Sequence, residues 1–440
     1  MRVRLLFFLA CLFSPLTLFA AESHLPPVKG WMVTPFLLLL AAIAIVPFIS
    51  RAWWDKYYPH VSIGLGFAVF AYYSLALDAR RMLETSLDYV SFIMLIGSLF
   101  VASGGIFLHT ERHATPWLNT LLLAAGAVVS NLLGTTGASM LLIRPFLRMN
   151  KQRVRGFHVV FFIFVVSNIG GALTPIGDPP LFLGYLNGVP FRWTIVNVWP
   201  IWLLALSLVL GIFFAVDTLY YRKYLAGGHR PVKGTRFHLM GSHNFIFLLI
   251  ILAAVFAPMP VRELIMLCAA IAAYRFASKE ALQKNEFSFT PIKEVAILFA
   301  GIFATMVPAL DWLALNADRI GIRSPGGFYW ASGILSSVLD NAPTYLNFLS
   351  AAMGLHGLML SNPDQVQILI AQHGQFLLAI SVGAVFFGAN TYIGNGPNFL
   401  VKSIAEHTGV DCPSFFGYVF KYSLPVLMPV FALVWFLFFR

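Results

Sequence analysis

The chain has 440 residues, of which 59% are hydrophobic and 11% charged, and its formal net charge is +11. Soluble domains contain about 45–50% apolar and about 25% charged residues, so this composition argues against a soluble globular protein and indicates a polytopic membrane protein. The basic residues occur in short clusters between apolar stretches, as cytoplasmic loops do, so no nucleic-acid partner is needed to explain the charge.

The first 21 residues have the pattern of a secretory signal. Arg2 and Arg4 precede an apolar stretch that ends at Ala20, and small residues follow where cleavage would occur. We therefore predict a signal peptide over residues 1–21. An uncleaved first helix is the alternative, although this stretch is shorter than the about 20 residues that a membrane span needs.

Ten apolar stretches have the length of membrane spans. They lie near 31–50, 61–78, 87–108, 157–186, 194–220, 243–258, 262–276, 292–310, 376–402 and 413–439. Two further apolar stretches, 117–143 and 327–360, carry polar breaks near the middle, at residues 130–136 and 336–343. Each of these two is either one long span or a re-entrant hairpin.

The basic loops predict the orientation of these spans. Acid-free basic clusters at 144–155 and 222–236 are separated by two spans, and two more spans lead to basic residues at 275–293. All three can be cytoplasmic, so that the span at 87–108 runs inward and the span at 292–310 runs outward. A hairpin at 117–143 then places the mature N-terminus outside, whereas a single span there requires an uncleaved N-terminus.

A repeat relates the two halves of the chain. The segment 174–183 (TPIGDPPLFL) returns 217 positions later as 391–400 (TYIGNGPNFL), with six identities in ten residues. Glycine and proline at this density break a helix, and paired breaks in two halves point to a transporter's substrate site. We predict inverted halves at 86–236 and 291–440, preceded by spans at 30–85 and joined by linking spans at 237–290.

The broken segments are expected to meet, because unwound backbone at membrane depth survives only where it lines a cavity or is buried in protein. Their polar side chains are rich in oxygen and include no basic group, which suits a small hard cation. The first half contributes Asn131, Thr135, Thr136, Ser167, Asn168, Thr174 and Asp178, and the second half contributes Ser337, Asp340, Asn341, Thr344, Asn390, Thr391, Asn395 and Asn398. We place Na⁺ at Asp178, Asp340 and Asn341.

Asp178 and Asp340 are the two acids expected to couple transport. An ionisable side chain at the bilayer centre costs at least about 2.5–3.5 kcal/mol, so it indicates a function. Removal from water penalises the charged form of a carboxyl group, so such a group can hold a proton and exchange it for Na⁺. The alternative is that each aspartate caps the half-helix that follows it, and one carboxylate can do both. His158, beside a basic loop, is expected to lie at the membrane interface.

Three motifs together resemble the ion transporter superfamily, which includes NhaD-type sodium/proton antiporters, citrate and dicarboxylate carriers, and arsenite permeases. They are the segments 167–180, 340–343 and 394–398, and the resemblance extends from about residue 30 to 438. It implies an all-α polytopic membrane protein with an inverted repeat, two re-entrant hairpins and two broken helices. It also implies a scaffold and a transport domain, a homodimer, and an elevator-like motion.

Within that superfamily the chain is most similar to NhaD-type antiporters and to citrate-transporter-like proteins of the CitMHS type. Asp178 after Pro-Ile-Gly and Asp340 in Asp-Asn-x-Pro match the NhaD-type pattern, although Pro179 and Pro180 depart from it. Leu181 stands where many carriers have asparagine. Carboxylate carriers tend to have Ser-Asn-Thr at the hairpin tips, whereas the tips here read Ser-Asn-Leu and Ser-Val-Leu.

The sequence therefore predicts a multi-pass sodium (or other monovalent cation)/proton antiporter of a bacterial-type inner membrane. The alternative is sodium-coupled transport of citrate, a dicarboxylate or another anion, in which Thr135 and Thr136 could serve the anion. An intramembrane aspartyl protease has little support, because Pro175 stands where its Gly-x-Gly-Asp motif needs glycine. We expect no enzymatic activity and no cofactor, with Na⁺ and H⁺ as the transported ions and the lipid bilayer as the surrounding partner.

Overall fold

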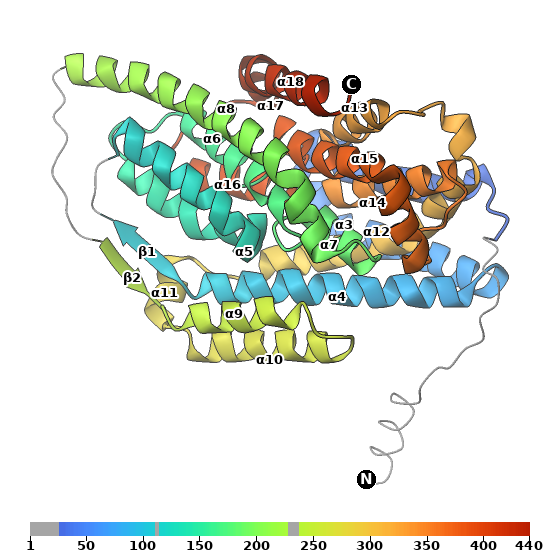
Figure 1. Cartoon of the computed structure of the whole chain (residues 1–440). Helices are drawn as coiled ribbons and strands as arrows, with labels where there is room; N and C mark the ends of the chain where they lie inside the picture. Colours follow the sequence, from blue (N-terminus) through green and yellow to red (C-terminus); the bar gives the residue numbers. More distant parts are fainter. Residues whose placement is uncertain (1–25, 111–113, 228–236) are drawn as a thin grey trace, which may run out of the picture.

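The computed structural model describes residues 26–110, 114–227 and 237–440, so the predicted signal peptide lies outside the described residues. Helices pack side by side through almost all of it (Figure 1). Within the described ranges, nine helices are long and apolar enough to cross a membrane. The prediction of an all-α polytopic membrane protein is confirmed. The one departure is a small antiparallel sheet of β1 (Phe107–Thr110) and β2 (Phe237–Met240), with Phe107 opposite Met240.

Two series of elements follow the same order of long helix, hairpin, broken helix and final helix. The first series is α4 (Ala79–Gly104), α5 (Pro116–Met149), α6 (Gly156–Val165), η2 (Ile169–Leu173), α7 (Pro179–Leu186) and α8 (Phe191–Ala226). The second is α12 (Thr290–Leu315), η3 (Ala317–Ile320), α13 (Pro325–Ser336), α14 (Asn341–Leu355), α15 (Pro363–Phe387), η4 (Gly388–Asn390), α16 (Gly396–His407), α17 (Phe415–Tyr418), the π-helix η5 (Val419–Leu427) and α18 (Met428–Phe438).

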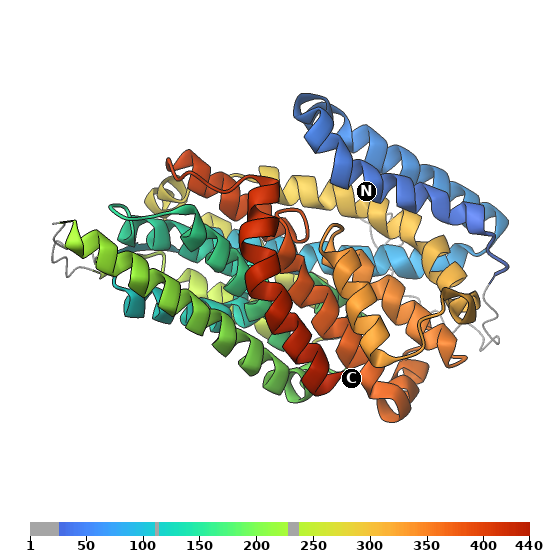
Figure 2. The ribbon, with the colours of Figure 1, turned by 90° about the horizontal axis from the view of Figure 1, so that it is seen from above.

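A pair of helices precedes each series and packs on the long helix of the other half. These elements are η1 (Gly30–Val33), α2 (Thr34–Ile49) and α3 (Arg51–Ala76) in front, and α9 (Asn244–Ala254), α10 (Val261–Phe276) and the short α11 (Lys279–Lys284) between the series. The α2–α3 pair lies against α12 in Figure 2, and α9 and α10 lie beneath α4 in Figure 1. The two halves therefore interlock instead of packing as separate units.

Glycine allows α3 and α12 to cross closely. A Cβ atom added to Gly66 of α3 would lie 2.9 Å from the Cα atom of Gly301 in α12. Beside this contact, the Ser62 hydroxyl donates a hydrogen bond to the carbonyl of Ile297, at 2.8 Å. Small residues let membrane helices approach closely and exchange such bonds, so this contact holds α3 and α12 together.

Both stretches with a polar break are re-entrant hairpins. A straight helix of the length of α5 would keep its ends about 50 Å apart, yet the amide of Ala114 donates to the carbonyl of Met149, at 3.1 Å. The chain reverses at Gly134, whose φ of 73° and ψ of 155° suit only glycine. In the second hairpin, α13 and α14 run back on each other, with the Phe328 and Phe348 rings 6.1 Å apart. We call these segments hairpin 1 (116–149) and hairpin 2 (325–355).

The two broken helices unwind in the same way. A Cβ atom added to Gly177 would lie 2.0 Å from the carbonyl oxygen of Gly171, and one added to Gly394 would lie 2.6 Å from that of Gly388. The two glycine pairs are related by the same offset of 217 residues as the sequence repeat. The repeat therefore conserves a close backbone contact that only glycine permits.

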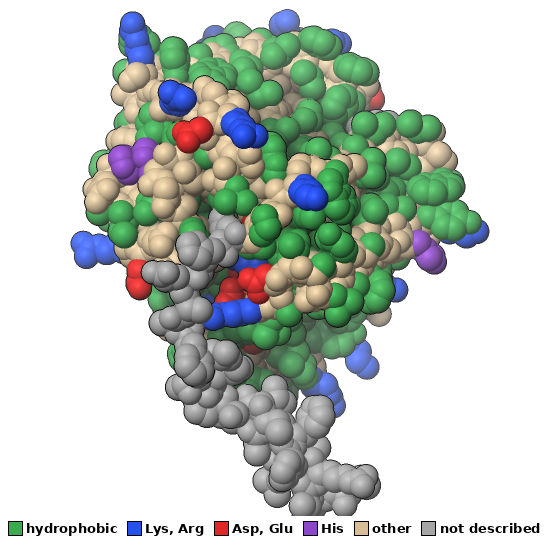
Figure 3. Space-filling view, turned by 90° about the vertical axis from the view of Figure 1, so that its right-hand side faces the viewer, with side chains coloured by type: hydrophobic (Ala, Val, Ile, Leu, Met, Phe, Trp, Pro, Cys, Tyr) green, Lys and Arg blue, Asp and Glu red, His purple; other side chains and the backbone are tan. Residues whose placement is uncertain are grey.

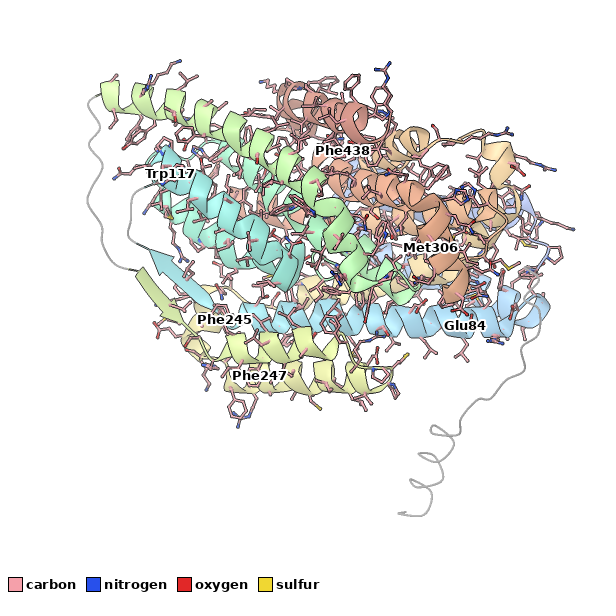
Figure 4. All side chains as sticks on the ribbon, in the orientation of Figure 1. Glu84, Trp117, Phe245, Phe247, Met306 and Phe438 are labelled. Carbon is pink, nitrogen blue, oxygen red and sulfur yellow. The ribbon has the colours of Figure 1, made fainter. Side chains whose placement is uncertain are left out.

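The outer surface is apolar and the broken helices lie inside. Large side chains such as Leu75 (89% exposed) and Phe67 (70%) face outward, and hydrophobic side chains are spread widely over the face in Figure 3, with few charged groups between them. Figure 4 shows the side chains that fill the space between helices, including Met306 of α12, which is 1% exposed. All residues of α6 after Gly156 are buried, as expected for a helix that is apolar on every side.

Candidate ion-binding site

Asp178 stands at the N-terminus of α7, but its side chain does not cap that helix. Its φ of −139° and ψ of 142° are those of an N-cap residue, yet no side-chain capping bond forms, and the residue is fully buried. Asn395 occupies the corresponding position of α16, with φ of −150° and ψ of 141°, and also makes no capping bond. The two side chains are thus available for contacts across the molecule.

The Asp178 carboxylate accepts hydrogen bonds from both halves of the chain. Oδ1 accepts from the Thr135 hydroxyl at 2.7 Å and from Asn395 Nδ2 at 3.1 Å, while Oδ2 accepts from Asn341 Nδ2 at 2.5 Å. These donors come from hairpin 1, the second broken helix and hairpin 2. We call the four residues the Asp178 cluster. No basic side chain of the described residues forms a hydrogen bond or ion pair with Asp178.

A chain of amides connects this cluster to the second break. Asn395 Nδ2 also donates to the Ser167 carbonyl at 3.1 Å and to Asn168 Oδ1 at 3.2 Å. Asn168 Nδ2 donates to Asn398 Oδ1 at 2.7 Å, and Asn398 Nδ2 in turn donates to the Thr391 carbonyl at 2.8 Å. Amide side chains thus satisfy backbone groups that the helix break leaves without intrahelical partners.

Each hairpin tip is tied to its own broken helix by equivalent threonines. The Thr174 hydroxyl donates to the Asn131 carbonyl at 2.7 Å, and the Thr391 hydroxyl donates to the Ser337 carbonyl at 2.5 Å. The two halves differ in a second contact between the hairpin tip and the broken helix. Asn131 Oδ1 accepts from the backbone amides of Leu173 and Thr174, whereas in the second half Asn390 Nδ2 donates to the Ser337 hydroxyl at 2.9 Å.

Asp340 does cap its helix, as the alternative interpretation predicted. Its Oδ1 accepts from the backbone amide of Ala342 at 3.0 Å, at the start of α14, and its carbonyl accepts from the Thr344 hydroxyl at 2.9 Å. The residue is half-buried. Asn341 joins the two aspartates, because its side chain bonds to Asp178 and its backbone follows Asp340.

Thr136 faces a small cavity instead of the Asp178 cluster. A cavity of about 20 Å³ lies between the tip of hairpin 1 and α4, and its walls include Thr135, Thr136, Phe92, Leu95 and Leu99. About 10–15 Å³ is enough to hold one water, so the cavity has room for one water-sized ligand. The candidate residues therefore gather around the two hairpin tips and the two breaks, with Thr136 at the edge facing α4.

A second buried polar cluster was not predicted from the sequence. Asp217 of α8 forms an ion pair with Arg153 and hydrogen bonds with His158 Nε2 at 3.1 Å and Asn119 Nδ2 at 2.8 Å. His158 is fully buried, because Asp217 supplies a partner inside the protein; its expected depth at the membrane interface stays a prediction. An acid within the apolar stretch 194–220 was the signal that could have found this cluster.

Comparison with known proteins agrees with this architecture. A profile of the family described as "Putative citrate transport" matches residues 26–439. A 46 kDa membrane protein of Mycobacterium leprae is 23% identical over 356 residues, which cover 74% of this chain and 80% of the relative. An uncharacterized transporter of Mycobacterium tuberculosis is 25% identical over 355 residues, with the same coverage of 74% and 80%. The similarity to citrate-transporter-like proteins is confirmed, and that to NhaD-type antiporters stays a prediction. The chain belongs to the "Putative citrate transport" family and is a multi-pass membrane transporter.

Proposed function

We propose that this transporter exchanges Na⁺, or another monovalent cation, for protons, and that the Asp178 cluster binds the coupling ion. The observation that carries the proposal is a fully buried carboxylate whose partners come from both halves of the chain and include no basic side chain. A buried carboxylate without a cationic partner is stabilised either by a proton or by a bound cation. Competition between the two ions at Asp178 would couple their movements.

The side chains around Asp178 can serve either ion. Asn341 Nδ2 donates to the carboxylate, while Asn341 Oδ1 is buried without a partner among the described residues. Rotation of this amide by half a turn would present its oxygen to a cation or to a proton on Asp178. The Thr135 hydroxyl can likewise turn its lone pairs toward a cation. Together with the carboxylate, these groups would form an oxygen site of the kind that Na⁺ prefers.

The position of the cluster suits alternating access. Its donors come from both hairpins and from the second broken helix, so movement of these elements relative to α4 would carry the ion with them. Asp340, close to Asp178, is our second proton or cation site, although one of its oxygens caps α14. We further propose a homodimer in a bacterial-type inner membrane, as the resemblance to the ion transporter superfamily implies.

Cation-coupled transport of citrate or another carboxylate is the second candidate. The description of the family and the threonines at the tip of hairpin 1 favour it. In the present conformation the cavity beside Thr136 has a volume of about 20 Å³, which suits a single ion or water more than a tricarboxylate. Citrate would require hairpin 1 to move away from α4.

Inverted membrane vesicles that contain the transporter can separate the two candidates. Addition of Na⁺, Li⁺ or K⁺ to acidified vesicles should cause dequenching of a pH-sensitive dye if the chain is an antiporter. Labelled citrate uptake that depends on Na⁺, without dequenching by Na⁺ alone, would refute antiport. Asp340→Asn should abolish exchange at normal expression, whereas Asp318→Asn, on the exposed η3 turn, is the matched control and should behave as the wild type. Unchanged exchange in Asp340→Asn would remove Asp340 from the mechanism.

A further inference from the structure

Two arginines on the second arm of hairpin 1 have unused hydrogen-bonding capacity. Arg144 and Arg148 lie four residues apart on α5, so they occupy the same helix face. The Nη1 group of each is buried and has no hydrogen-bond partner among the described residues. Like charges at this spacing repel each other, and buried polar groups normally have partners. Within the described ranges, these two Nη1 groups therefore lack the hydrogen-bond acceptor that buried polar groups normally have.

The contacts that these arginines make leave both Nη1 groups without an acceptor among the described residues. Arg144 Nη2 forms an ion pair with Glu286 at 3.2 Å, but the Glu286 side chain is 80% exposed. The Arg148 guanidinium stacks on the ring of Phe107, at 4.7 Å, and forms no ion pair with a described acid. Lys284 approaches the same ring at 5.4 Å and is paired with Glu280. Counting only the described residues, one positive charge and two buried N–H groups thus remain uncompensated.

We propose that Arg144 and Arg148 bind an oxyanion, either a carboxylate or a phosphate group. The planar guanidinium group presents parallel N–H donors that match the oxygen atoms of these anions. The anion would lie between hairpin 1 and the segment that carries β1, because Phe107 supports Arg148 and Glu286 approaches Arg144 from outside the hairpin. Thr135 and Arg144 are separated by about 14 Å of helix, so this site is distinct from the Asp178 cluster. The positive-inside rule places it on the cytoplasmic side.

If hairpin 1 moves relative to α4, as the proposed function requires, a bound oxyanion would connect it to an element outside the hairpin. Hairpin 1 carries a ligand of the Asp178 cluster, whereas β1 follows α4 and pairs with β2 in front of α9. The anion would therefore stabilise the conformation in which these parts are in contact. Glu286 would compete with the anion for Arg144, since its carboxylate already accepts a hydrogen bond from Arg144 Nη2.

Thermal unfolding of the purified full-length protein in a neutral detergent tests the site. Inorganic phosphate and citrate, titrated at constant ionic strength, should each raise the unfolding temperature of the wild type. Arg148→Gln should weaken the apparent affinity roughly tenfold or more, as expected for loss of a hydrogen bond to a charged group. Arg222→Gln, an exposed arginine of α8, is the matched control and should leave the affinity unchanged. Glu286→Gln should strengthen the affinity by roughly threefold, the scale of an exposed ion pair.

The source of the anion is distinguished by reconstitution. If a lipid headgroup fills the site, phosphatidylcholine vesicles that also contain phosphatidylglycerol should stabilise the wild type but not Arg148→Gln, and free phosphate should have no effect. If a free anion fills it, phosphate or citrate should act in phosphatidylcholine alone. The proposal is overturned if none of the three anions stabilises the wild type more than Arg148→Gln. Should Arg148→Gln fail to fold, equal affinities of Glu286→Gln and the wild type would overturn it.

Discussion

Asp178→Asn is expected to abolish cation/proton exchange and leave the protein folded. The new amide has nearly the shape of the carboxylate, and its oxygen can accept from Thr135 and Asn395 in the position of Oδ1. Its NH₂ group would then face Asn341 Nδ2, which donates to Oδ2 at 2.5 Å in the wild type. Asn341 can turn its amide, because its Oδ1 has no partner in the described part of the chain, and can accept from the new NH₂ group.

The number of buried hydrogen-bonding groups left without a partner determines how much each variant changes the free energy of unfolding. The wild type leaves Asn341 Oδ1 without a partner, and the variant would leave Asn341 Nδ2 without one, so the free energy of unfolding should change by about 1 kcal/mol or less. Asp178→Ala differs, because Thr135 and Asn341 both lose their acceptor while Asn395 keeps the Ser167 carbonyl. Each unpaired buried donor costs about 1–3 kcal/mol, so this variant should lose about 2–6 kcal/mol.

Two measurements on the same variants check this reasoning. Thermal unfolding in detergent should give Asp178→Asn an unfolding temperature close to that of the wild type and should give Asp178→Ala a clearly lower one. In inverted vesicles, neither variant should show Na⁺-dependent dequenching of a pH dye. Wild-type dequenching in Asp178→Asn would show that Asp178 does not couple the ions. Equal destabilisation of both variants would refute the amide rotation at Asn341.

Three further outcomes are expected. Gly177→Ala should destabilise the protein by about 3 kcal/mol or more, because its Cβ atom would lie 2.0 Å from the Gly171 carbonyl oxygen; a normal size-exclusion profile after heating would contradict this. Asp217→Asn should lower the unfolding temperature, since breaking the buried pair with Arg153 costs about 3–5 kcal/mol, and an unchanged temperature would contradict that estimate. Burial raises the pKa of the Cys412 thiol to about 12, so maleimide labelling at Cys412 should be slow at neutral pH and accelerate as the pH rises toward that value. Peptide mass spectrometry would separate it from labelling at Cys268, which is also free and exposed; rapid labelling of Cys412 at neutral pH would show a more acidic thiol.

The sequence predicted the breaks better than the hairpins. Glycine and proline in the repeated segment identify both broken helices, because each contains a backbone contact that only glycine allows. The sequence could not decide whether hairpin 1 was a hairpin or a single long span. Its helical pattern is continuous, and a single residue, Gly134, reverses the chain. The packing of α3 on α12 and α10 on α4 could not be predicted, because apolar lipid-facing and apolar buried faces look alike in the sequence.

The candidate site was predicted as a group of residues, but not as a set of bonds. The four breaks do bring Asp178, Thr135, Asn341 and Asn395 together. Asp340 and Asp178 both precede a half-helix, so the sequence could not distinguish their roles. In the structure one oxygen of Asp340 caps α14, whereas Asp178 makes no capping bond. Asp217 within an apolar span does indicate a buried acid, but the sequence does not identify Arg153 as its partner.

The difference between the two copies of the repeat now has a physical reason. Asp178 and Asn395 occupy equivalent positions, and their side chains meet at 3.1 Å. Two carboxylates at that distance would repel by about 5 kcal/mol at an effective dielectric constant of about 20, and two amides would leave no charge to exchange. One aspartate opposite one asparagine keeps a single carboxylate at this pair of equivalent positions. In the proposed mechanism a proton or a monovalent cation would neutralise it, with the remaining ligands supplied by both halves of the chain.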